Sequence, residues 1–271
     1  MKKIKTLEEK CKELRQTVLE LCYRKGGHIS SSFSCTELLV ALYYTGYLNI
    51  SSKNYNKKTR DIFVLSKGHG AEMLYAILAD LNFFPKKWLK NSYRENDCKL
   101  GGHVSHKVPG VEFSTGSLGH GLNFIGGTAL ASKMDKNKNK HVVLLGDAEC
   151  TAGSVWEAAS FISYEKLNNV TAIVDFNKIG NFDFVSKFMN LEIFAERWKS
   201  CAWDVYEVKD GNNLKKIIHA LKKTSSNNKR PKVIIAHTIK GKGVKIFEND
   251  RLWATRQVSS EIFEKVKKEL L

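Results

Sequence analysis

Apolar positions follow the helical period in some segments of the chain and form unbroken runs in others. Between residues 7 and 25, apolar side chains recur every three or four positions among charged ones, which is typical of an amphipathic helix. Gly26-Gly27 ends this pattern. We predict further helices over residues 71–83, 122–134, 154–167 and 260–271.

Four short runs consist almost entirely of apolar residues and predict buried strands. They cover residues 62–65, 141–146, 170–175 and 233–236. Continuous apolar strands that alternate with helices are typical of a parallel sheet covered on both faces. We therefore predict an α/β fold of three layers, a mostly parallel sheet with helices on both faces, whose functional residues gather at the carboxyl ends of the strands.

Length and hydropathy restrict the organisation of the chain. The 271 residues suffice for a substantial core and contain no linker-like segment, so we expect a single domain over residues 1–271. No apolar run approaches the roughly 20 residues that cross a bilayer, and the first residues do not resemble a secretory signal. We expect a cytoplasmic location and no membrane partner.

Charge adds a preference for anionic partners without selecting one. The net charge of +16 would attract phosphorylated sugars, acidic carrier proteins or nucleic acid. Lysine-rich segments at 53–58, 133–140 and 222–230 lack the interleaved aromatic residues of a nucleic-acid groove, so we expect solvated surface and no nucleic-acid partner. The six cysteines form no CxxC pair, which disfavours a zinc knuckle.

Polar side chains follow two of the predicted strands. Asp147 comes directly after the strand at 141–146, and Asn177 follows the strand at 170–175. One carboxylate, one amide oxygen and a backbone carbonyl, which Ile179 is placed to offer, would anchor Mg²⁺ or Ca²⁺ carrying a diphosphate. Taken alone, an Asp and an Asn at such positions are more often turn formers.

Several sequence blocks together resemble transketolase, specifically the separate N-terminal subunit of its split form. They appear in the family's order between about residues 10 and 250. The blocks are Gly26-Gly27-His28 with 30–37, Leu65-Ser66-Lys67-Gly68-His69, Gly102-His103, 112–121, Gly146-Asp147 with 154–158, Asp175-Phe176-Asn177-Lys178, and 236–243.

The resemblance implies a thiamine-diphosphate-binding fold of the diphosphate-binding type and a role for each site residue. The metal ligands would be Asp147, Asn177 and the Ile179 carbonyl. His28 and His103 would be catalytic, contacting the hydroxyls and carbonyl of a sugar substrate and moving protons, since imidazole titrates near neutrality. The cofactor-binding residues would be His69, Gly116, Ser117, Leu118, Gly146, Asp147, Ala148, Asn177 and Lys240.

The resemblance also implies a partner chain. In this family, the glutamate that activates thiamine diphosphate belongs to a pyrimidine-binding domain, and 271 residues do not contain that domain. We expect a C-terminal transketolase-like subunit to supply the glutamate within an α2β2 heterotetramer. The chain alone would be inactive.

Three segments depart from the family pattern. Ala148 replaces a glycine, and Thr151-Ala152 replaces a Gln-Glu pair. The loop after Asn177 lacks its usual Asp-Gly. Trp253-Ala254-Thr255-Arg256 stands where a Trp-His-Gly would bring a histidine to the cofactor, although Arg256 could replace some of the charge.

These observations leave three hypotheses. The first is one half of a transketolase that transfers a two-carbon ketol unit from a ketose phosphate to an aldose. The second keeps thiamine diphosphate but uses a nucleotide-linked sugar or an acyl carrier protein as acceptor. The third is a non-catalytic regulatory subunit whose cofactor site has decayed.

Overall fold

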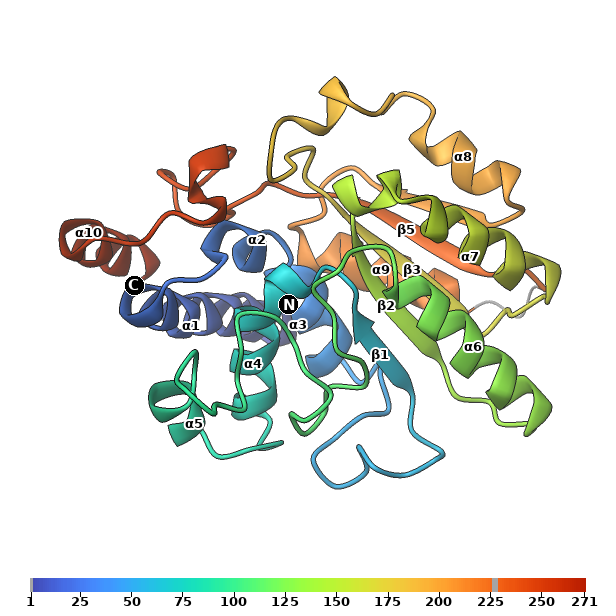
Figure 1. Ribbon diagram of the computed structural model, residues 1–271, viewed down its shortest axis with the longest axis horizontal. Helices are drawn as coiled ribbons and strands as arrows, with labels where there is room; N and C mark the ends of the chain where they lie inside the picture. Colours follow the sequence, from blue (N-terminus) through green and yellow to red (C-terminus); the bar gives the residue numbers. More distant parts are fainter. Residues whose placement is uncertain (1, 226–228) are drawn as a thin grey trace.

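The computed structural model describes residues 2–225 and 229–271, and within them one parallel sheet of five strands forms the centre of the molecule (Figure 1). The strand order is β1-β2-β3-β5-β4. The strands are β1 (Ile62–Leu65), β2 (His141–Gly146), β3 (Val170–Phe176), β4 (Asp204–Val208) and β5 (Lys232–His237). All neighbouring pairs are parallel, as the sequence predicts.

Helices cover both faces of the sheet, which confirms the predicted three-layer α/β fold. One face packs against α1 (Lys2–Lys25), α2 (Ile29–Ser34), α3 (Thr36–Tyr44), α4 (Ala71–Asp80) and α9 (Leu214–Thr224). The other packs against α6 (Gly121–Met134), α7 (Gly153–Tyr164) and α8 (Phe194–Ser200). Successive strand residues alternate between the two cores: Phe63 and Leu65 belong to the first, Ile62 and Val64 to the second.

The remaining elements connect these layers or lie at the edge of the molecule. They are α5 (Lys87–Asn91), α10 (Ser260–Leu270), and the short 3-10 helices η1 (Gly68–Gly70), η2 (Ala148–Thr151), η3 (Val185–Lys187) and η4 (Arg251–Ala254). The C-terminal α10 returns to pack beside the N-terminal α1 (Figure 1). Among the described residues, no helix is long and apolar enough to cross a membrane.

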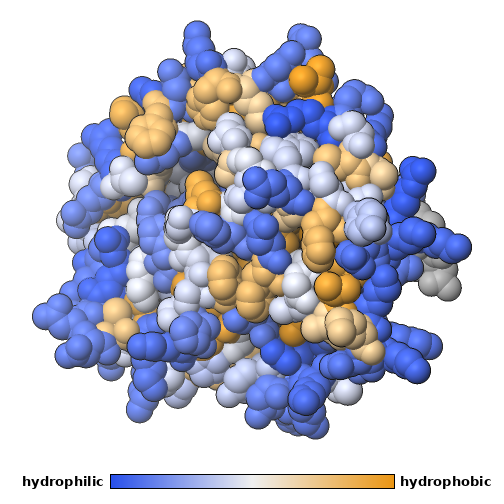
Figure 2. Space-filling model, turned by 45° about the vertical axis from the view of Figure 1, so that its right-hand side comes forward, coloured by the Kyte–Doolittle hydropathy of each residue, from blue (hydrophilic) through white to orange (hydrophobic). Residues whose placement is uncertain are grey.

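The lysine-rich segments lie mostly at the surface. Residues 53–58 and 133–140 are largely exposed or half-buried, although Asn139 is buried. The segment 222–230 includes residues 226–228, which lie outside the described residues. Figure 2 shows hydrophilic residues over much of the side that carries α6 and α7, with smaller apolar patches between them.

Candidate functional site

A cavity of about 210 Å³ opens at the carboxyl ends of the strands. It is lined by segments that follow β1, β2, β3 and β5, by the segment before α6, and by the end of the α1–α2 loop, α2 and η4. Eleven of the twelve predicted site residues line it, and Ser117 does not. Its lining residues are His28, Ser31, Lys67, His69, His103, Gly116, Leu118, Gly146, Asp147, Ala148, Glu149, Asn177, Ile179, Gly180, Asn181, Lys240, Ala254 and Thr255.

Asp147 extends from the tip of β2 and is 2% exposed. Its Oδ1 accepts a hydrogen bond from the Ala148 amide at 2.7 Å, and its Oδ2 accepts one from the Lys178 amide. Burial raises the pKa of this carboxyl to about 6, although both amide hydrogen bonds oppose the rise. The backbone thus fixes the carboxylate at the cavity wall next to the segment that follows β3.

The segment after β3 turns sharply at Lys178, whose φ of 67° lies in the left-handed region. The turn brings the Ile179 amide to the side-chain oxygen of Asn177 at 3.1 Å. Gly180 N donates to Asp183 O at 2.9 Å, which closes the loop 180–183 into a tight hairpin. Asn177 and Ile179 therefore face the same cavity as Asp147.

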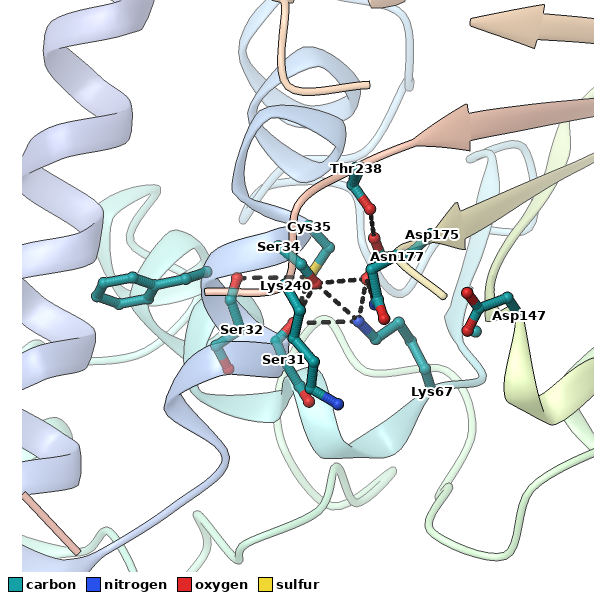
Figure 3. A network of polar contacts seen from close by, with 12 residues as sticks. Ser31, Ser32, Ser34, Cys35, Lys67, Asp147, Asp175, Asn177, Thr238 and Lys240 are labelled. Carbon is teal, nitrogen blue, oxygen red and sulfur yellow. Dashed lines mark hydrogen bonds and ion pairs between the residues drawn. The ribbon is translucent and has the colours of Figure 1, made fainter. Parts of the chain in front are cut away.

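A buried ion pair lies directly beneath these residues (Figure 3). The Lys67 ammonium binds the Asp175 carboxylate, and both side chains are almost completely buried. Ser34 and Thr238 donate further hydrogen bonds to Asp175. Burial would raise the pKa of Asp175, but Lys67 and these hydroxyls outweigh it and hold the pKa below its usual value.

Lys240 supplies a second ammonium group at the cavity wall. It is 4% exposed, and its Nζ donates to the Ile179 carbonyl at 3.0 Å. Burial, with a smaller contribution from Lys67, lowers its pKa to about 8, while Asp147 and Asp175 oppose the shift. Two lysines beside an acid and an amide make this wall suited to a phosphate that arrives with a divalent cation.

Three histidines of the cavity lining stand together. The ring centroids of His28 and His103 are 5.1 Å apart, and those of His28 and His69 are 6.2 Å apart. Burial, Lys67 and Lys240 lower the pKa of His69 well below its usual value, so this ring is neutral at pH 7. His28 Nδ1 is buried with no hydrogen-bond partner among the described residues, and the Glu72 carboxylate lies 3.8 Å from it.

Glu72 supports the histidines from the first turn of α4. Its Oε1 accepts hydrogen bonds from the His28 amide at 3.2 Å and from the Tyr93 hydroxyl at 2.7 Å, and its Oε2 accepts one from Ser32 at 2.9 Å. Burial lowers the pKa of His103, and the Glu72 carboxylate opposes this shift. One buried carboxylate therefore holds the backbone of His28 and opposes the lowering of the pKa of His103.

Glycines allow loops to meet closely at the floor of the cavity. A Cβ on Gly68 would lie 2.9 Å from the backbone of Thr115, so the loop after β1 and the segment before α6 can touch only with glycine there. Glu149 joins the same region, since it accepts hydrogen bonds from Ser66, Gly119 N and Gly146 N. Leu118, 39% exposed, stands at the cavity edge.

The structure shows where the residues that depart from the family pattern lie relative to the cavity. Ala148 is not among the residues with positive φ, so its methyl group causes no backbone strain. Ala254 and Thr255 line the cavity where the resemblance leads one to expect a histidine. Arg256 lies outside the lining and stacks over Trp253, with 5.1 Å from its guanidinium carbon to the ring centroid.

The oxygen atoms of Asp147, Asn177 and Ile179 fit a hard divalent cation, and the neighbouring lysines fit a diphosphate. Over residues 2–225 and 229–271, no group of three or more His, Cys, Asp and Glu side chains is placed to hold a metal. A cation in this cavity would therefore depend on the amide, the main-chain carbonyl and the oxygens of its own diphosphate.

Sequence reasoning did not single out four residues that shape the site: Lys67, Glu72, Glu149 and Asp175. For two of them the sequence contains a signal, a charged residue within an apolar stretch. Glu72 is a charged residue within the apolar stretch of α4, and Asp175 interrupts the apolar run of β3. A charge in such a run needs a buried partner, which marks a polar network.

Comparison with known proteins gives consistent matches over nearly the whole chain. The family model described as "Transketolase, thiamine diphosphate binding domain" matches residues 11–261. The chain is 37% identical to a subunit of apulose-4-phosphate transketolase from Phocaeicola vulgatus, with 98% of both chains covered. It is 32% identical to 6-deoxy-6-sulfo-D-fructose transketolase subunit SqwG of a Clostridium species, covering 97% of this chain and 96% of the relative.

Longer relatives match over part of their length. Human transketolase is 32% identical over 99% of this chain and 42% of its own. The crystal structure of transketolase from Campylobacter jejuni superposes with a TM-score of 0.90 at 28% identity, covering 98% of this chain and 43% of that one. The chain thus spans less than half the length of these two proteins.

Proposed function

Because the chain belongs to the transketolase family and carries its thiamine diphosphate-binding domain, we propose that it is the diphosphate- and metal-binding subunit of a two-subunit transketolase. The complex would transfer a two-carbon ketol unit from a ketose phosphate to an aldose acceptor. The observation that carries this proposal is the single cavity that Asp147, Asn177, Ile179, Lys240 and the three histidines share.

Each group has a distinct task in this proposal. Asp147, Asn177 and the Ile179 carbonyl hold Mg²⁺ or Ca²⁺, while Lys240 and His69 meet the diphosphate. Bound thiamine diphosphate supplies the carbon that accepts the ketol unit. His28 and His103, whose ring centroids are 5.1 Å apart, bind the hydroxyls and carbonyl of the sugar and move protons at those oxygens.

A partner chain completes the site. Relatives of matching length are each named as one subunit of their transketolase, which implies a second subunit for those enzymes. In this chain, exposed apolar side chains lie at or next to the cavity edge, namely Leu118, Phe182 and Leu252. We propose that a chain with the pyrimidine-binding domain and its activating glutamate covers this rim, in an α2β2 assembly.

The small side chains of Ala254 and Thr255 support a substrate other than the usual ketose. They line the cavity where a histidine is expected, and the split relatives carry names of unusual sugars. We propose a branched or otherwise modified ketose phosphate as one of the two sugars. The intact histidines and metal ligands favour a catalytic subunit over a regulatory one.

Reconstitution tests the proposal. The chain alone should give no ketol transfer, and the chain with its pyrimidine-domain partner should give transfer that needs both thiamine diphosphate and a divalent cation. Xylulose 5-phosphate and apulose 4-phosphate are compared as donors, with ribose 5-phosphate and glyceraldehyde 3-phosphate as acceptors. Absence of cation-dependent cofactor binding in the complex would refute the proposed function.

A further inference from the structure

We propose that the buried Lys67–Asp175 pair orients the side-chain amide of Asn177, so that its oxygen and not its nitrogen faces the bound cation. This inference rests on the proposed function, because it assumes that Asn177 is a metal ligand. It assigns a positioning role to two residues that lie beneath the ligand set (Figure 3).

The Asn177 side chain needs neighbours that fix its orientation, because an amide has a nearly symmetrical shape. The two ends of an asparagine side chain have nearly the same size, but only the oxygen can bind a cation, while the NH2 group repels it. A 180° rotation would therefore abolish the ligand without moving the backbone. The neighbours of Asn177 must distinguish the two ends.

Asp175 makes this distinction. Asn177 Nδ2 donates to Asp175 Oδ2 at 3.3 Å, and the Ile179 amide donates to Asn177 Oδ1 at 3.1 Å. An ionised carboxylate can only accept hydrogen bonds, and a backbone N–H can only donate them. Rotation of the Asn177 amide would place its oxygen against the Asp175 carboxylate, which are two acceptors. It would also place its NH2 group against the Ile179 N–H, which are two donors.

The orientation depends on the Asp175 carboxylate being held in place by its other partners. Its carboxylate receives donors from four segments: Ser34 of α2 at 2.5 Å, Lys67 after β1, Asn177 after β3 and Thr238 after β5. Lys67 is also fixed, since its Nζ donates to Ser31 O at 3.0 Å. The Lys67 charge makes an ionised carboxylate tolerable at a site that is 0% exposed.

Replacing both partners tests the role without leaving a buried charge unpaired. In Lys67→Met with Asp175→Asn, the net charge is unchanged, and neutral replacement of a buried pair is often tolerated. The new amide at position 175 could accept from or donate to Asn177, so only the Ile179 amide would still select the orientation of the Asn177 side chain, and the preference would weaken. We expect Mn²⁺ affinity, measured on the full chain by electron paramagnetic resonance, to fall about 10- to 100-fold, the usual cost of losing a supporting group.

A third substitution separates orientation from general damage. When Asn177→Asp is added to the double variant, residue 177 presents an oxygen at both ends and accepts from both Ile179 N and the new amide at position 175. We expect this variant to recover Mn²⁺ affinity to within a few-fold of the original chain. Because the new carboxylate also adds a charge, the recovery supports orientation only if it exceeds the gain that Asn177→Asp gives in the original chain.

A second Lys–Asp pair, with a buried carboxylate and a half-exposed lysine, provides the control. Lys140 binds Asp61 at 2.9 Å at the opposite ends of β1 and β2, and Asp61 is 3% exposed. The variant Lys140→Met with Asp61→Asn should leave Mn²⁺ affinity unchanged. Thermal unfolding of all variants reports whether each one folds.

The outcomes distinguish this inference from the proposed function. If the original chain binds no Mn²⁺ with or without thiamine diphosphate, the proposed metal site is wrong. If it binds Mn²⁺ and Asp147→Ala does not, but the Lys67/Asp175 variant binds as the original does, only the orienting role is wrong. Failure of Asn177→Asp to restore affinity in a folded protein also overturns the inference.

Discussion

At the scale of single residues, the cavity combines groups whose protonation is set by what surrounds them. His69 is kept neutral by burial and by two lysines, whereas Asp175 is kept ionised by Lys67. Neither state follows from the residue type alone. His69 is assigned to the cofactor, and Asp175 contacts the proposed metal ligand Asn177, so both protonation states bear on the proposed binding site.

The first prediction concerns Asp147, the one carboxylate of the proposed ligand set. Asp147→Ala should weaken divalent-cation-dependent binding of thiamine diphosphate by at least about 100-fold, the upper end of what losing a mere supporting group costs. Titration calorimetry at fixed cation concentration measures it. The variant should unfold at an equal or higher temperature, because burying this carboxylate disfavours its charged form. Unchanged affinity would contradict the ligand assignment.

A second prediction concerns the charge of Glu72. Burial and His28 lower the pKa of His103, and the Glu72 carboxylate partly offsets them. In Glu72→Gln the offset is lost, so the pKa of His103 should fall further. The acid limb of kcat/KM for the reconstituted complex should then move to lower pH.

Tyr93→Phe is the control for Glu72, because it removes one hydrogen bond to the same carboxylate and keeps the charge. It should leave the pH profile in place. An identical shift in both variants would show that packing and not charge is responsible. Losing one hydrogen bond should cost each variant roughly 1–3 kcal/mol of stability.

At the scale of elements, the pattern of apolar residues predicted β1, β2, β3 and β5 and missed β4, one of the two edge strands of the sheet. The runs at 62–65, 141–146 and 170–175 are buried on both faces, so each shows an unbroken apolar signal. The edge strand β4 is half-buried and contains Asp204 and Glu207, so it resembles a loop in sequence. Tertiary pairing with β5 decides its structure.

In the candidate site, too, the sequence predicted some residues and missed others. Asp147 and Asn177 could be predicted because they follow recognisable strands, and the structure places both at one cavity. Lys67 and Glu72 make their contacts with segments distant in sequence, such as Asp175 and Tyr93. The pairing of these charges depends on strand order, which the spacing of residues along the chain does not contain.

The interface between β2 and α6 leads to a third prediction. His141 is 1% exposed, with Nδ1 3.1 Å from the Thr128 hydroxyl and Nε2 3.0 Å from the Ser132 hydroxyl. Burial lowers its pKa from 6.5 to about 4. Between these values the unfolded chain binds a proton that the folded chain rejects, so stability should fall as pH drops from 6.5 to about 4.

This loss should amount to about 3 kcal/mol, since one pKa unit corresponds to about 1.4 kcal/mol. His141→Gln can keep both hydrogen bonds but cannot be protonated, so its unfolding free energy should depend less on pH across this range. Urea unfolding at pH 4.5 and pH 7 measures the difference. The exposed His219 of α9 gives the control, and equal slopes for all three proteins would contradict the prediction.

At the scale of the whole molecule, the chain gathers its chemistry at one end of the sheet and leaves the rim of the cavity apolar. Phe182 is 87% exposed and Leu252 is 60% exposed, and their segments are joined because Arg251 donates to the Phe182 carbonyl. Exposed apolar side chains beside a polar cavity are typical of a protein–protein contact. This placement agrees with a partner that closes the cofactor site.

The last prediction follows from that rim. Phe182→Ser with Leu252→Ser should weaken association with the partner subunit by at least about tenfold, because burying each apolar side chain contributes about 1.5–3 kcal/mol. The unfolding temperature of the isolated chain should hardly change, since both side chains are exposed in it.

Met134→Ser is the control: Met134 is 76% exposed but lies at the far end of α6 from the cavity. Sedimentation of mixed subunits measures association, and equal affinity for all three chains would place the partner on another face. Saturating partner concentration should restore ketol transfer in the rim variant, because the metal ligands and histidines remain intact, and this recovery separates a docking defect from damage to the site.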